Sequence, residues 1–279
     1  MTAATDALDQ AVHAAMKRAA ETAILPHYRS LADADIREKT PGDVVTVADH
    51  ASEAILADAL AGIEPNAAIV GEEASEADPA VMDRLGDGLC WIIDPLDGTN
   101  NYAAGKPPFG IIVALSQNGE TERGWLYDPL SGRFCRARRG HGAFIDGERI
   151  AARETGETPP VAAISLIFVD GEKRERLKAH IAPHYGVVDI PRCAAEQSPR
   201  LVLGENDLSL FERTLAWDHA AGVLWLNEAG GKAARFDGSP YRTDSRAKGM
   251  IGAASPRLFD EMAERIAAMN AGPFSPASD

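Results

Sequence analysis

The sequence predicts an α/β protein in which helices pack on two mixed β-sheets, one in each half of the chain. Short apolar runs typical of strands and amphipathic segments typical of helices follow one another along the chain. In the first half several strand-like runs are consecutive and joined by turn residues, which indicates antiparallel pairing. In the second half strands and helices alternate, a pattern typical of layered α/β structure.

Two helices should open the first half. Residues Thr5 to Ile24 carry an apolar stripe at helical spacing, and the segment from Thr46 to Asp49 has the form of a capping box that starts a second helix. Asn118-Gly119 lies between two apolar runs and is a strong hairpin signal. The strands expected in this half are Ala68–Val70, Leu89–Ile93, Gly110–Ser116, Glu122–Tyr127, Phe134–Arg138 and Ala143–Ile150.

The polar segment Arg153–Pro160 is the expected boundary between two halves, residues 1–152 and 153–279. The second half should contain an apolar helix headed by Asp218, which stops at Gly230-Gly231, and a last helix that begins at Ser255-Pro256. The other elements expected here are a strand at Val161–Phe168, a helix from Glu172, a strand at Gly186–Ile190, a helix from Ala194 and a strand near Leu208–Phe211.

Composition places the chain among ordinary globular proteins. Its 279 residues, 45% hydrophobic and 25% charged, suit one large domain or two closely packed ones. The formal charge of −14 makes nucleic acid and anionic membranes unlikely partners, but it still permits a phosphorylated substrate, because bound divalent metal can reverse the local field. Three widely spaced cysteines indicate a reducing compartment, and with neither a transmembrane-length run nor a signal-peptide core the expected location is cytoplasmic.

The most informative segment is Trp91–Tyr102, in which a buried strand leads into two carboxylates three residues apart. Pro95 removes a backbone N–H and fixes a bend, so that Asp94 and Asp97 can converge on one point. These acids and the carbonyl of Leu96 are the hard oxygen ligands that Mg²⁺ prefers. An Asp-rich turn after a core strand is the plainer explanation, but the neighbouring features agree better with a metal site.

Other elements supply further polar groups. Gly98 would let the backbone approach a ligand closely, and Thr99 would offer a hydroxyl beside it. Glu72 and Glu73 follow a strand, and Asp218 opens a helix. Alone, the glutamates would be a solvated loop pair and Asp218 a helix cap. Together, carboxylates from separate elements can build a site for two or three metals.

At these residues the chain resembles the inositol monophosphatase family of magnesium-dependent, lithium-sensitive phosphomonoesterases. The resemblance extends from about Lys39 to Gly231. It implies a layered α-β-α-β-α sandwich and a homodimer. The segments that carry it are Asp43–Asp49, Gly71–Glu73, Asp94–Tyr102 and Trp217–Gly222.

The resemblance also implies a role for each of these residues. Thr99, supported by Asp49, would orient the attacking water together with Glu72, and Asp97, Gly98 and Thr99 would contact the substrate phosphate. Lys39 and Glu73 would lie near a third metal position or support it. The metal ligands that the resemblance implies are Glu72, Asp94, the carbonyl of Leu96, Asp97 and Asp218, with two or three Mg²⁺ per site.

The substrate end departs from the inositol phosphatase pattern. Those enzymes bind a sugar hydroxyl through an acid seven positions before the motif aspartate, whereas here that position is Phe211, with Glu212 beside it. Their Gly-Ser/Thr-Ala stretch is replaced by Arg192–Glu196. Glu212 and Arg192 are therefore candidate substrate-binding residues, and Arg192 is either a contact to a second anionic group or a surface cation.

Two other motifs fit less well. Phosphatases of the haloacid dehalogenase type place a second Asp two residues after the nucleophile, whereas here the spacing is three. An EF-hand needs an oxygen donor at the third loop position and Glu at the twelfth, which are Leu96 and Gly105 here. The basic cluster Arg136, Arg138 and Arg139 is expected on a solvated strand edge.

The sequence thus predicts a phosphomonoesterase that hydrolyses a small phosphorylated metabolite, first of all inositol monophosphate, by metal-activated water. Fructose 1,6-bisphosphate, 3′-phosphoadenosine 5′-phosphate and histidinol phosphate remain open as substrates. The resemblance leaves one alternative of another class, a regulatory protein that binds the transcription machinery. The complete carboxylate set favours the enzyme.

Overall fold

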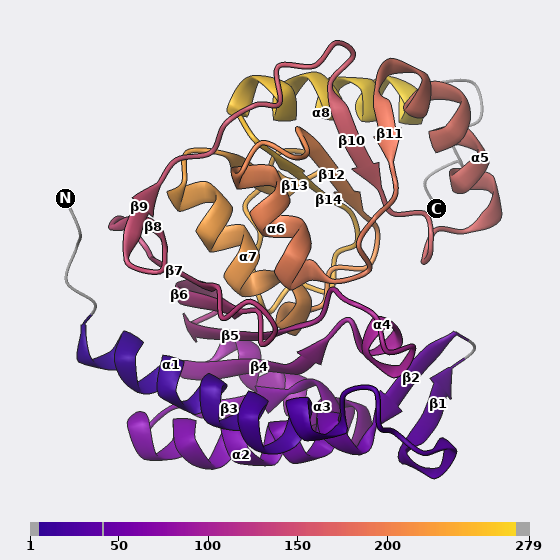
Figure 1. The fold of residues 1–279 in the computed structure, drawn as a ribbon. Coiled ribbons are helices and arrows are strands. Elements are labelled where there is room, and N and C mark those ends of the chain that lie inside the picture. The colour runs from indigo at the N-terminus through magenta and orange to yellow at the C-terminus, as the bar shows by residue number, and fades with distance from the viewer. Residues whose placement is uncertain (1–5, 41, 272–279) are drawn as a thin grey trace.

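Five layers of secondary structure stack in the order helices, sheet, helices, sheet, helices (Figure 1). The computed structural model describes residues 6–40 and 42–271. Each sheet mixes parallel and antiparallel pairs, so the predicted mixed sheets and the α-β-α-β-α sandwich that the resemblance implied are confirmed. None of the helices formed by the described residues combines the length and the apolar character of a membrane span.

The first helical layer contains α1 (Ala7–Ala19) and α2 (Val47–Ile63), which lie side by side against the larger sheet (Figure 1). A π-helical turn, Ala20–Ile24, continues α1, so the helix expected up to Ile24 is confirmed except for Thr5, which lies outside the described residues. Asp9 of α1 pairs with Arg136 at 3.2 Å. Arg136 is buried, so the prediction that it lies on a solvated strand edge is wrong.

The larger sheet has the strand order β3-β4-β5-β6-β7-β8-β9. β3 and β4 are parallel and all later neighbours are antiparallel, with Asn118 and Gly119 at positive φ in the expected hairpin turn. β4 continues beyond the expected Ile93, because Asp94 still pairs with Ile112. The strands are β3 (Ala68–Gly71), β4 (Leu89–Asp97), β5 (Gly110–Gln117), β6 (Glu120–Tyr127), β7 (Phe134–Arg138), β8 (Gly142–Ile145) and β9 (Glu148–Ile150).

The smaller sheet has the order β11-β10-β12-β14-β13. β10 ends at Ile164 rather than at the expected Phe168, and both Ile167 and Phe168 are exposed. β13, at the edge, and β14, between β12 and β13, were not predicted from the sequence. The strands are β10 (Val161–Ile164), β11 (Gly186–Val188), β12 (Leu208–Phe211), β13 (Lys232–Arg235) and β14 (Met250–Ala253).

The middle layer, α6 (Ala194–Val202) and α7 (Ala216–Glu228), lies between the two sheets (Figure 1). Burial on both sides explains why α7 is apolar around almost its whole circumference. It begins two residues before the expected Asp218, which therefore lies in its first turn. The outer layer beyond the smaller sheet is α5 (Gly171–His180) and α8 (Pro256–Ala271).

The chain leaves the larger sheet after β9 and enters the smaller one at β10, along the segment predicted as a boundary. By sequence α6 and α7 belong to residues 153–279, yet α7 packs on β6 and β7 of the first half. We propose that residues 1–152 and 153–279 share this middle layer and unfold as one cooperative unit.

Gly124 of β6 is expected to be essential for this packing. A Cβ atom there would lie 2.7 Å from Ala221 Cα and 2.9 Å from Ala221 O, which are backbone atoms of α7. Gly124→Ala should therefore reduce the free energy of unfolding by about 1–3 kcal/mol, measured by urea denaturation. Gly62→Ala in α2 is the matched control, because nothing lies within 4 Å of its added Cβ. Equal urea midpoints for Gly124→Ala and wild type would contradict this packing.

Candidate active site

The acids of β3 and β4 meet because these strands are parallel neighbours in register, with Gly71 opposite Ile93. β3 leads directly into α3 (Glu72–Ala77), whose first residues are Glu72 and Glu73. The carboxylate of Glu53, on α2, accepts the backbone N–H groups of Glu73 and Ala74 at 2.8 and 2.9 Å. Sequence reasoning missed Glu53, although it lies one helical turn after Asp49 on α2.

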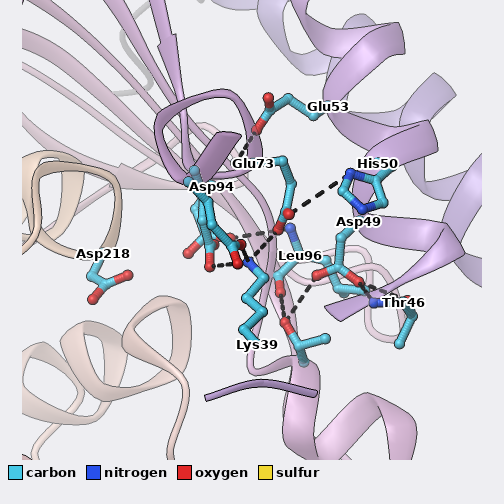
Figure 2. Close-up of polar contacts among 12 residues, drawn as sticks. Lys39, Thr46, Asp49, His50, Glu53, Glu73, Asp94, Leu96 and Asp218 are labelled. Atoms are coloured by element: carbon cyan, nitrogen blue, oxygen red, sulfur yellow. Dashed lines mark hydrogen bonds and ion pairs between the residues drawn. The ribbon is translucent and has the colours of Figure 1, made fainter. Parts of the chain in front are cut away.

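Lys39 neutralises part of this acidic cluster. Its Nζ lies 3.1 Å from Glu72 Oε1, 2.6 Å from Glu73 Oε1 and 2.8 Å from Glu76 Oε2 (Figure 2). Burial opposes its charge, but the three glutamates raise the pKa of Lys39 above its ordinary value. The lysine comes from β1 (Ile36–Thr40), which pairs with β2 (Asp43–Thr46) in a hairpin that the polar sequence did not predict.

Asp49 joins the start of α2 to Thr99. Its Oδ2 accepts the Thr46 backbone N–H at 2.8 Å, so the expected capping box is present (Figure 2). Its Oδ1 lies 2.9 Å from Thr99 Oγ1, which is also 2.9 Å from the carbonyl oxygen of Leu96. Burial raises the pKa of Asp49 to about 6, although the hydrogen bonds from Thr46 and Thr99 lower it. The residue thus caps a helix and orients a hydroxyl at once.

Asp94 and Asp97 lie on either side of an irregularity in the pairing of β4 with β5. The bend at Pro95 is held by Ser52, whose Oγ donates to the Pro95 carbonyl at 2.8 Å. Asp94 is almost fully buried, whereas Asp97 Oδ2 accepts the backbone N–H of Ala195 at 2.7 Å. Asp94 therefore lines the cavity from a buried position, and Asp97 points to the start of α6.

Gly98 and Thr99 follow at the turn into α4 (Thr99–Ala103). Gly98 has φ +84°, and a Cβ there would lie 2.9 Å from the carbonyl oxygen of Pro108. Asn101 fixes this turn, because its Nδ2 donates to the carbonyls of Pro108 and Pro191 at 2.8 and 2.9 Å. Only glycine fits this position without strain, because the backbone of Pro108 approaches it closely; the predicted close approach to a ligand stays a prediction.

Asp218 reaches the same cavity from the first turn of α7. Glu72, Asp94, Asp97 and Asp218 all line it. Figure 2 shows Asp218 set apart from the group around Lys39. Its Oδ2 lies 3.9 Å from Nη2 of Arg213, a residue that sequence reasoning did not single out. The predicted ligands thus line one cavity.

Burial and mutual repulsion raise the pKa values of two carboxyl groups in the cavity, Asp94 and Glu72. Burial raises the pKa of Asp94 well above its ordinary value, and the charges of Glu72, Asp97 and Asp218 raise it further. Burial also raises the pKa of Glu72 to about 8, with Lys39 opposing it and Asp218 adding to it. Repulsion of this kind is what a divalent cation would relieve, and carboxylates are the ligands that Mg²⁺ prefers.

A divalent metal therefore fits the chemistry of the donor set. As the side chains stand, no three His, Cys, Asp or Glu residues in the described part of the chain are grouped so that they could hold an ion. The contact of Glu72 with Lys39 and the separated position of Asp218 explain this (Figure 2).

The expected Arg192 and Glu212 also line the cavity. Glu212 is buried, and its Oε2 lies 2.7 Å from Nζ of Lys173. Sequence reasoning missed Phe168, which was placed in a strand, and Gln197, which lines the cavity with no hydrogen-bond partner for its amide within the described structure. Neither residue had a motif that could have revealed it.

Comparisons with known proteins agree with this geometry. The sequence profile of the inositol monophosphatase family matches residues 5–270. The fructose-1,6-bisphosphatase/inositol-1-monophosphatase of Thermotoga maritima is 30% identical over 237 residues, which cover 82% of this chain and 88% of that protein. The Nus factor SuhB of Escherichia coli strain K12 is 31% identical over 269 residues, which cover 91% and 93%. The solved structure of the Thermotoga maritima IMPase has a TM-score of 0.76 at 25% identity, with 95% of this chain and all of that chain covered.

Proposed function

Because this chain belongs to the inositol monophosphatase family, we propose that it is a magnesium-dependent phosphomonoesterase that acts on a small phosphorylated metabolite. Inositol monophosphate is the first candidate substrate. The observation that carries the proposal is a single cavity lined by Glu72, Asp94, Asp97 and Asp218, beside a threonine hydroxyl that Asp49 orients. Fructose 1,6-bisphosphate, 3′-phosphoadenosine 5′-phosphate and histidinol phosphate are the alternative substrates.

Glu72, Asp94, Asp97, Asp218 and the carbonyl of Leu96 would hold two or three Mg²⁺. When bound, the metal would supply charge neutralisation for the phosphate and a lower pKa for water. Glu73 and Lys39 would support the outer side of this group, since Lys39 already lies against Glu72 and Glu73.

Thr99 and Glu72 would position the attacking water. When Thr99 Oγ1 donates its hydrogen to Asp49 Oδ1, its oxygen can still accept a hydrogen from water. Asp49 therefore fixes which way the hydroxyl points, and Glu72 offers a second acceptor. The backbone at Gly98 and the first turn of α4 would face the phosphate, because the φ of +84° at Gly98 opens this approach.

Removal of magnesium should abolish hydrolysis. Phosphate release from inositol 1-phosphate is measured with Mg²⁺, after addition of excess chelator, and after Mg²⁺ is restored. Activity should disappear with the chelator and return with the metal, because the four carboxylates repel the substrate phosphate unless bound metal neutralises their charge. Full activity in excess chelator would contradict the proposal. Inhibition by lithium at millimolar concentration is the further result expected from family membership.

A second candidate function is a regulatory one, namely binding to the transcription machinery. It is supported by the similarity to proteins named Nus factor SuhB at 31% identity. A purely regulatory chain could lose Glu72 or Asp97, whereas this chain keeps every acid of the predicted set. The chelator experiment separates the two, because only the enzyme requires Mg²⁺ for phosphate release.

We also propose a cytoplasmic homodimer. The cytoplasmic location is supported by Cys90, Cys135 and Cys193, which are all buried free thiols. The dimer rests on family membership. No membrane or nucleic-acid partner is proposed, in keeping with the formal charge of −14.

A further inference from the structure

Helix α2 presents three polar side chains to the segments that carry the predicted metal ligands. Asp49, Ser52 and Glu53 lie on one face of its first two turns, because residues three and four apart are neighbours on a helix. Asp49 and Ser52 each form a hydrogen bond with the segment 94–99. Glu53 instead contacts the backbone at the start of α3, directly after Glu72 (Figure 2). One helix therefore contacts both segments that supply acids from the larger sheet.

Glu53 takes the place of a helix cap for α3. A helix commonly begins with a side chain that accepts an N–H group of its second or third residue. The residue before α3 is Gly71, which has no such side chain, and the N–H groups of Glu73 and Ala74 are accepted by Oε2 and Oε1 of Glu53 at 2.8 and 2.9 Å. A helix of six residues is marginal by itself, so this carboxylate from α2 stabilises its first turn.

The carboxylate of Glu53 also occupies the space beside Gly71. A Cβ atom at residue 71 would lie 2.4 Å from Cδ, 2.4 Å from Oε2 and 2.7 Å from Oε1 of Glu53. The φ of −103° at Gly71 is one that other residues adopt readily, so the backbone conformation does not require glycine. The glycine is required because the glutamate approaches it closely.

The two hydrogen bonds fix the positions of Glu72 and Glu73. The peptide unit between these residues is planar and contains both of their Cα atoms, so holding the Glu73 N–H holds both. The second hydrogen bond holds the next peptide unit through the N–H of Ala74. Glu72 lines the cavity, whereas Glu53 is not among the described residues that line it. Any effect of Glu53 on the cavity must therefore pass through this backbone.

We propose that Glu53 is a positioning residue for the metal ligands, because it holds the peptide units on both sides of Glu73 and so sets the affinity of the cavity for a divalent cation. The inference rests on the proposed function and adds to it a residue outside the cavity. Glu53 does not contact the ion. It determines where the Glu72 and Glu73 side chains begin, and their carboxylates then have less freedom to lose when they bind a cation.

Titration of Mg²⁺ into the metal-free protein without substrate, followed by calorimetry, tests this role. Glu53→Gln keeps the length of the side chain, but its amide nitrogen cannot accept an N–H. Glu53→Asp keeps the charge, but it is one methylene shorter and cannot reach both N–H groups. Each variant should bind Mg²⁺ about tenfold more weakly, the effect of losing one charge-assisted hydrogen bond. Wild-type affinity in Glu53→Asp would show that only the charge matters and would overturn the positioning role.

Glu228→Gln is the matched control. Glu228 is half-buried like Glu53, and it also accepts two backbone N–H groups, those of Gly140 and Gly142 at 2.7 and 2.6 Å. It is not among the described residues that line the cavity. Glu228→Gln should lower the urea midpoint as Glu53→Gln does, but it should leave Mg²⁺ affinity unchanged. An equal loss of affinity in Glu228→Gln would assign the effect to lower stability and would overturn the proposal.

The titration separates this inference from the proposed phosphatase function. Weaker Mg²⁺ binding to both Glu53 variants supports the positioning role even if no phosphomonoester is hydrolysed, in which case the phosphatase function fails alone. Metal-dependent hydrolysis by wild type, with the same Mg²⁺ affinity in every variant, overturns the positioning role and leaves the phosphatase standing. A wild-type protein that binds no Mg²⁺ overturns both.

Discussion

Asp94→Asn is expected to lower the rate of phosphomonoester hydrolysis by about a thousandfold, because it removes one of the charges that hold the proposed metal opposite the developing negative charge. Asp94 is buried at the centre of the acidic end, where Glu72, Asp97 and Asp218 all influence its pKa. Its Oδ1 accepts the Leu96 backbone N–H at 3.1 Å, a bond that the amide oxygen of asparagine can keep. The variant should therefore lose the negative charge of residue 94 and keep the shape and the hydrogen bond of its side chain.

The stability of the metal-free variant provides the control. The pKa of Asp94 is raised on folding, so the unfolded chain releases this proton more readily than the folded chain. Above the unfolded pKa the buried carboxylate consequently costs stability, and asparagine avoids that cost. The thermal midpoint of metal-free Asp94→Asn should equal or exceed that of wild type. Wild-type hydrolysis by the variant, or loss of activity only through unfolding, would contradict the proposed role.

Thr99→Val is expected to reduce kcat by about a hundredfold to a thousandfold, the range typical for loss of a group that directs proton transfer. Valine keeps the shape of the side chain but cannot donate to Asp49 or accept a hydrogen from water. Thr99→Ser keeps the hydroxyl and should retain most of the rate. Steady-state kinetics with Mg²⁺ should show the change mainly in kcat.

Asp49→Asn tests the residue that orients the Thr99 hydroxyl. Its amide can still accept from one threonine, but it cannot serve both Thr46 and Thr99 with two carboxylate oxygens. The rate should therefore fall between those of Thr99→Ser and Thr99→Val. Equal activity of Thr99→Val and Thr99→Ser would show that the hydroxyl has no part in the reaction.

The acidic part of the cavity could be predicted from sequence because its residues lie in short segments with strong local signals. The bend at Pro95, the glycine at position 98 and the capping box at Thr46 each follow from the residue type alone. The strand order also follows from hairpin turns such as Asn118-Gly119. What local signals could not show was that β4 remains paired through Asp97, since that depends on the partner Gly110 in β5.

The substrate end could not be predicted because its residues come from distant segments without motifs. The apolar residues Ile167 and Phe168 suggested a longer strand, but pairing stops at Ile164 and both side chains line the cavity. The neutralisation of Glu212 by Lys173 joins residues 39 positions apart. Such contacts arise from how the elements of the second half pack on one another, which residue spacing does not encode.

Two mechanisms compete for the same aspartate-rich motif, and they differ in the number of displacements at phosphorus. In direct hydrolysis water attacks phosphorus, whereas a nucleophilic Asp94 would first form an aspartyl phosphate. Asp94 is almost fully buried between the other acids, and its Oδ1 already accepts a backbone hydrogen bond. Under the proposed function, Glu72 and Thr99 would direct a water molecule instead.

The stereochemical course of hydrolysis distinguishes these mechanisms most directly. An ester whose phosphorus is made chiral by isotopic and sulfur substitution is hydrolysed in ¹⁸O-labelled water, and the configuration of the released product is determined. Inversion at phosphorus is the predicted result, because one in-line attack by water inverts the centre. Retention, which two successive displacements through an aspartyl phosphate would give, or a trapped phosphorylated enzyme, would contradict it.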